Sequence, residues 1–160
     1  MEKNGKNMKR IASFSVDHTK LVPGIYVSRR DGDTVTYDIR MKKPNGGDYL
    51  GNGELHTIEH LFATYARNSR FSDSVIYIGP MGCRTGFYMV LRDTVTPCDA
   101  IALVRESMEF TAGFEGEIPG ASEAECGNYR EHDIAGAKRT AAVFLRTVGG
   151  WTPEKLSYPV

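Results

Sequence analysis

The stretch GNGELHTIEHLFATYARNSR, from Gly51 to Arg70, says most about the fold of this chain. Its apolar residues recur every three or four positions, which predicts an amphipathic helix over residues 55–70. His56 and His60 are four positions apart, so they lie on one side of that helix with Glu59 beside them. The opposite, apolar side of the helix consists of Ile58, Leu61, Phe62 and Tyr65.

Four short stretches are rich in β-branched and aromatic residues and predict strands. One of them, TVTYDIRM, alternates strictly, so Val35, Tyr37 and Ile39 are expected to face the core. Thr36, Asp38 and Arg40 would then face the other way. The four stretches are residues 24–29, 34–41, 73–79 and 85–92.

Two further helices are predicted downstream. Thr96 can cap a helix that starts at Pro97 and stops at Gly113, and another covers residues 133–147. Strands interspersed with helices and joined by short connections predict an α+β fold, with a largely antiparallel sheet packed against helices. The 160 residues are expected to form a single domain, with residues 1–10 as a mobile N-terminal extension.

The charge balance disfavours polyanionic partners. Lys and Arg number 20 and Asp and Glu also number 20, so the formal net charge is zero. We therefore expect neither nucleic acid nor a membrane as a partner. No secretory signal is apparent, and the three cysteines, Cys83, Cys98 and Cys126, are an odd number at wide spacings. This favours reduced thiols and a cytoplasmic location.

The histidine pair predicts a metal site, because side chains at positions i and i+4 can reach one ion. Such a site needs a third protein ligand. Cys126, Glu131 and His132 are the downstream candidates. The order His-x-x-Glu-His is that of the inverted zinc peptidases, whose third ligand is a distant glutamate. A zinc metallopeptidase of this type is therefore the alternative function.

Four motifs taken together are more specific than any one of them. They are SFSVDHTKL (13–21), LHTIEHL (55–61), GPMGCRTGFY (79–88) and PGASEAECGNY (119–129). In this order the set resembles the S-ribosylhomocysteine lyase family (LuxS, autoinducer-2 synthase), over about residues 13–142. The fold of that family is grouped with the half-domains of the inverted zinc peptidases.

The resemblance implies a ligand set and an acid/base pair. One divalent metal per subunit would be held by His56, His60 and Cys126, natively Fe(II), with zinc or cobalt as substitutes. Glu59 and Cys83 would move protons. The implied reaction cleaves the thioether of S-ribosylhomocysteine to homocysteine and 4,5-dihydroxy-2,3-pentanedione, the autoinducer-2 precursor. It proceeds by two carbonyl migrations through enediolates and a β-elimination.

The resemblance also implies contacts to the substrate. Ser13, His18 and Arg40 match family positions that bind substrate or organise the site, and Ser13 and His18 flank a predicted first strand, FSVD. Family members are homodimers with active sites at the interface. Many carry an acidic residue in the strand before the Pro-Met-Gly-Cys turn, where this chain has Tyr77, so the sequence does not identify what replaces that acid.

Overall fold

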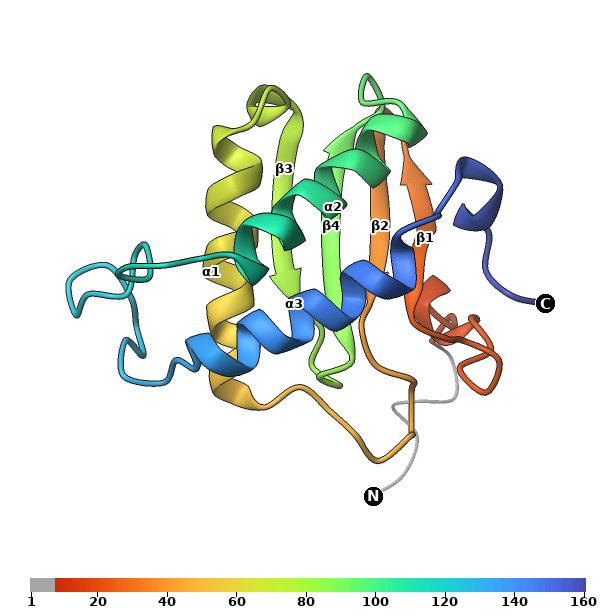
Figure 1. The fold of residues 1–160 in the computed structure, drawn as a ribbon. Helices are drawn as coiled ribbons and strands as arrows, with labels where there is room; N and C mark the ends of the chain where they lie inside the picture. Colours follow the sequence, from red (N-terminus) through yellow and green to blue (C-terminus); the bar gives the residue numbers. More distant parts are fainter. Residues whose placement is uncertain (1–7) are drawn as a thin grey trace.

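The computed structural model describes residues 8–160 and contains a four-stranded antiparallel sheet (Figure 1). The strand order is β1-β2-β4-β3, and each of the four stretches rich in β-branched and aromatic residues forms one of these strands. Short hairpins join β1 to β2 and β3 to β4, which makes both pairings antiparallel. The strands are β1 (Gly24–Asp31), β2 (Thr34–Arg40), β3 (Val75–Pro80) and β4 (Gly86–Arg92).

Three helices accompany the sheet, α1 (Asn52–Asn68), α2 (Pro97–Ala112) and α3 (Ile134–Val148). In Figure 1, α2 and α3 run across the sheet, and α1 lies beside β3. Side chains cap two of these helices as expected for hydroxyl and carboxylate groups. Thr96 Oγ1 accepts from the Asp99 amide at 3.2 Å, and Asp133 Oδ1 accepts from the Gly136 amide at 2.8 Å. The α+β prediction is thus confirmed.

The two faces of the sheet differ in what covers them. Val35, Tyr37 and Ile39 are buried among the helix side chains, as their alternation predicted. The opposite face, here called the outer face, carries Asp38 and Arg40, which are only 1% and 3% exposed. Their burial was not foreseen, because alternation indicates the direction of a side chain but not what covers it.

The prediction that FSVD forms a strand is wrong. Residues Ala12–Phe14 form a short 3₁₀ helix, and a turn follows. In that turn Asp17 Oδ1 accepts from both the Thr19 amide at 3.0 Å and the Thr19 hydroxyl at 2.6 Å. Such a local carboxylate–backbone bond competes with strand pairing.

A mobile extension was predicted for residues 1–10. Residues 1–7 of it lie outside the residues that the structure describes. Within residues 8–160, no helix combines the length and apolar character that crossing a membrane would require.

Candidate metal centre

Helix α1 holds the two histidines on its half-buried side. Ile58, Leu61 and Phe62 are fully buried against the sheet and fix the rotation of the helix. His56 and His60 therefore point toward the long loop between α2 and α3. The amphipathic prediction for this helix is confirmed.

Both imidazoles are oriented by backbone carbonyls of that loop. His56 Nδ1 donates to the Glu131 carbonyl and His60 Nδ1 to the Pro119 carbonyl, each at 2.8 Å. A proton on Nδ1 leaves a free lone pair on Nε2, which is how metal-binding histidines are commonly arranged. Gly120 permits the close approach, because its φ is +71° and a Cβ there would lie 3.3 Å from His60 Nδ1.

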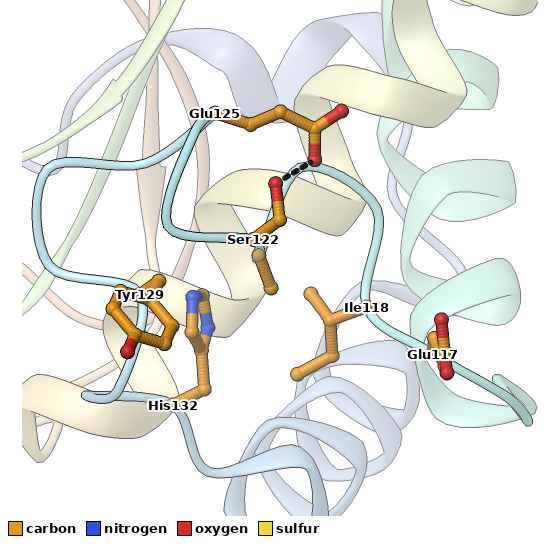
Figure 2. A pocket seen from close by; sticks show the side chains of 7 residues that line it. Glu117, Ile118, Ser122, Glu125, Tyr129 and His132 are labelled. Carbon is orange, nitrogen blue, oxygen red and sulfur yellow. Dashed lines mark hydrogen bonds between the residues drawn. The ribbon is translucent and has the colours of Figure 1, made fainter.

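Cys126 brings sulfur to the two free nitrogens. Its Sγ lies 3.3 Å from His56 Nε2 and 3.9 Å from His60 Nε2. The Cys126 amide donates to the Ser122 carbonyl at 3.0 Å, which closes a turn around the cysteine. Figure 2 shows the Ser122 hydroxyl, which bonds Glu125 at 2.8 Å, in the same turn. Two imidazoles and a sulfur thus converge from segments 66 residues or more apart.

His132 adds a fourth nitrogen. Donor atoms of His56, His60, Cys126 and His132 all lie within 4.8 Å of one another. His132 Nδ1 is 3.0 Å from Thr57 Oγ1, whereas its buried Nε2 has no hydrogen-bond partner among residues 8–160. Burial, and then the neighbouring His56 and His60, lower the pKa of His132.

These observations test whether a divalent ion fits. A thiolate and neutral imidazoles are ligands that zinc, iron and cobalt accept. A buried ring nitrogen without a partner is costly unless an ion or water satisfies it. The donor set of His56, His60 and Cys126, with His132 adjacent, therefore fits such an ion. A cavity of about 390 Å³ lies beside these donors, and His132 and Tyr129 are among the residues that line it (Figure 2).

Glu131 is not among these donors. Its backbone carbonyl faces His56, and its carboxylate accepts from Asn128 Nδ2 at 3.2 Å. The third ligand that the zinc metallopeptidase alternative requires is therefore directed elsewhere. This geometry disfavours that alternative.

Glu59 lies next to His60 at the edge of an open cavity of about 270 Å³. Pro119 and Gly120 also line this cavity. Glu59 thus shares a cavity with His60, and its role in proton transfer stays a prediction.

Cys83 lies in the turn between β3 and β4. The following residue, Arg84, has a φ of 59°, and the Arg84 carbonyl accepts from the Leu50 amide at 2.9 Å. This bond ties the turn to the segment that enters α1. The Cys83 side chain is exposed, and its sulfur lies 3.0 Å from Thr85 Oγ1 and 3.9 Å from Arg40 Nη1.

Arg40 is fixed by a buried ion pair with Asp38, which the strand alternation did not predict. Its Nη2 donates to Asp38 Oδ2 at 2.6 Å and its Nε to Asp38 Oδ1 at 3.1 Å. The spacing of Asp38 and Arg40, two apart on one strand face, was the available signal.

Neither Ser13 nor His18 belongs to the group of candidate metal donors. Ser13 lines a cavity of about 380 Å³ on the outer face, together with Tyr77 and Tyr88. None of the four candidate metal donors lines that cavity. His18 Nδ1 is 2.8 Å from the Val16 carbonyl, within its own turn.

The fold and the donor set define a class, an α+β protein with a His/Cys cluster that could hold a metal ion. The family model described as S-Ribosylhomocysteinase (LuxS) matches residues 11–155, and the chain belongs to this family. Among its relatives is an S-ribosylhomocysteine lyase of Phocaeicola vulgatus, 50% identical over 95% of this chain and 98% of the relative. Lyases of the same name from Clostridium beijerinckii and Clostridium acetobutylicum are 47% and 45% identical, each over 95% of this chain and 99% of the relative.

Proposed function

We propose that the protein is a metal-dependent lyase that cleaves the thioether of S-ribosylhomocysteine to homocysteine and 4,5-dihydroxy-2,3-pentanedione. The observation that carries the proposal is the convergence of His56 Nε2, His60 Nε2 and Cys126 Sγ in a chain of this family. These three residues would hold one divalent ion, natively Fe(II), with zinc or cobalt as substitutes. When bound, the ion supplies Lewis acidity at the sugar carbonyl.

The chemistry explains why proton carriers are needed. The thiolate of a thioether leaves readily only when a stabilised carbanion can form on the carbon next to the C–S bond, so the carbonyl must first move along the sugar from C1 to C2 and then to C3. Each move takes a proton from carbon and returns one to the neighbouring carbon. Loss of the C4 proton then expels the C5 thiolate by β-elimination.

Glu59 and Cys83 are proposed as the carriers of these protons. Glu59 borders the metal centre on one side, and Cys83 belongs to a different element, the β3–β4 turn. Two bases on separate elements can serve different carbons of one bound substrate. The Arg40 guanidinium near the Cys83 sulfur supports a role for the thiolate, which is the basic form.

Ser13, His18 and Arg40 are proposed to bind the substrate or organise the site.

We further propose a homodimer with active sites at the interface. Exposed apolar side chains at the outer face support it, because Ile11 and Tyr77 line the cavity there and are each more than half exposed. Tyr77→Glu should lower the dimer fraction measured by analytical ultracentrifugation; an unchanged dimer would place the interface elsewhere.

A single domain is also proposed, and a hydrophobic cluster that includes side chains of both the sheet and the helices supports it. Cytoplasmic location and independence from nucleic acid and membranes stay predictions.

Two substrates separate the lyase from the peptidase alternative. The metal-loaded protein is incubated with S-ribosylhomocysteine, and free thiol is titrated; a parallel sample receives casein. The proposal expects thiol release and intact casein. Cleaved casein without thiol release would overturn it.

A further inference from the structure

The end of the chain passes beside the free edge of β1 (Figure 1), and its Tyr158 contacts Asp38 on the outer face of the sheet. Trp151 Nε1 donates to the Ile25 carbonyl of β1 at 2.8 Å, which fixes the passage. Tyr158 then stacks on Tyr26, with ring centroids 5.2 Å apart and planes 25° apart. Because Tyr26 is opposite Asp38 in the β1–β2 register, Tyr158 arrives above the buried Asp38–Arg40 pair.

A continuous set of polar contacts leads from Tyr158 to Cys83. The Tyr158 hydroxyl donates to Asp38 Oδ2 at 2.7 Å, and Arg40 donates to both oxygens of the same carboxylate. The remaining guanidinium nitrogen, Arg40 Nη1, donates to Thr85 Oγ1 at 2.8 Å and is 3.9 Å from Cys83 Sγ. Every nitrogen of the guanidinium therefore has a partner, and one of them faces the sulfur.

These contacts restrict the orientation of the side chains that make them, from Tyr158 to Arg40. Asp38 and Arg40 are almost fully buried, so neither can exchange its partner for water without opening the face. The Tyr158 hydroxyl fixes the carboxylate against rotation, and the carboxylate fixes the plane of the guanidinium. Burial and the nearby Asp38 carboxylate raise the pKa of Tyr158, so the phenol keeps its proton and remains a donor.

We propose that Tyr158 is a positioning residue for the Cys83 sulfur and acts through Asp38 and Arg40. Tyr158 lies three residues (158 minus 155) beyond the end of the family match at residue 155. Its effect on turnover rests on the proposed role of Cys83, whereas its effect on the sulfur itself does not.

The test measures the reactivity of Cys83 without any substrate. Metal-loaded full-length protein is treated with iodoacetamide, and alkylation of Cys83 and Cys98 is followed separately by peptide mass spectrometry. Cys98 is exposed at the start of α2 and serves as an internal reference. Tyr158→Phe should lower the alkylation rate of Cys83 roughly threefold or more, because the thiolate reacts and a displaced guanidinium favours it less. The rate at Cys98 should not change.

Two further variants make the result decisive. Tyr26→Phe is the matched control, because it belongs to the same stack but its hydroxyl donates to the Val22 carbonyl instead. It should leave the ratio of Cys83 to Cys98 alkylation unchanged. A chain ending at Ser157 should lower that ratio at least as much as Tyr158→Phe.

An unchanged ratio in Tyr158→Phe would overturn the proposal, and so would an equal change in Tyr26→Phe, which would assign the effect to ring packing. Lyase assays of the same samples separate the two claims. If Tyr158→Phe lowers the ratio while the unaltered protein releases no thiol from S-ribosylhomocysteine, positioning holds and the proposed function fails. With both intact, Tyr158→Phe should lower kcat more than it changes KM.

Discussion

The imidazole of His132 lies nearly flat against that of His56, with ring centroids 4.0 Å apart and planes 19° apart. The stack limits rotation of His56, whose Nδ1 is also fixed by the Glu131 carbonyl. Burial and the two neighbouring histidines favour the neutral form of His132, so the stack adds no positive charge beside a bound cation. The centre thus combines oriented donors with a low local charge.

Cys126→Ser tests the sulfur donor. A hydroxyl is a poorer ligand than a thiolate for iron, cobalt or zinc. We expect metal affinity to fall by more than about tenfold, the least that loss of an outer-shell partner costs. Competition with a chromophoric chelator measures this affinity. Cys98→Ser is the matched control and should bind metal normally; equal affinity in Cys126→Ser would exclude Cys126 as a ligand.

Cys83→Ala and Glu59→Gln test the proton carriers. Each variant should retain metal in equal stoichiometry, since neither side chain belongs to the donor group. Turnover should fall by roughly 100-fold or more, which is the usual contribution of a positioned acid or base. Thiol release and metal analysis on the same samples measure the two properties. Near-normal turnover in either variant would remove that residue from the mechanism.

Asp38→Ala tests how much the buried Asp38–Arg40 ion pair contributes to the stability of the fold. Asp38→Ala leaves the Arg40 guanidinium buried without its counter-charge, which should cost about 3–5 kcal/mol of unfolding free energy. Urea denaturation measures this loss. The control is Asp31→Ala, which removes the partner of Arg29 from a solvent-exposed pair and should leave stability unchanged. Equal effects of the two substitutions would contradict the structural role of Asp38.

The stability of the protein at alkaline pH tests whether the pKa of Tyr158 is raised in the folded state. Burial, and then the Asp38 carboxylate, raise the pKa of Tyr158 above its usual value of 10.0. Above pH 10 the unfolded chain loses this proton while the folded chain keeps it, so stability falls as pH rises. The slope contributed is about 1.4 kcal/mol per pH unit. Thermal unfolding between pH 9 and 11 should show a shallower decline for Tyr158→Phe than for the unaltered chain; parallel curves would contradict the assignment.

Local patterns predicted most of the fold. The strand alternation, the cap at Thr96 and the period of α1 each depend on neighbours within a few residues, and all three agree with the structure. The strand prediction for FSVD was wrong, and the cause is also local. The turn closed by Asp17 and Thr19 outweighs the strand propensity of this segment.

The site was predicted less completely. The pair His56 and His60 is visible in one helical turn, but neighbours in space that are distant in sequence are not. His132 was considered only as a possible ligand, and its stack on His56 depends on how a long loop closes. Tyr158 is 120 residues from its partner Asp38, and no motif connects them. Such contacts follow from tertiary packing.

The central claim is that two imidazoles and a thiolate hold an ion that makes carbon–sulfur cleavage possible. The most direct measurement is thiol release from S-ribosylhomocysteine by anaerobically prepared, Fe(II)-loaded protein, compared with the same protein stripped of metal. We predict one homocysteine thiol per substrate consumed by the loaded protein and none by the stripped protein, with activity restored by Fe(II) or Co(II). Protein that binds iron stoichiometrically yet liberates no homocysteine would contradict the account.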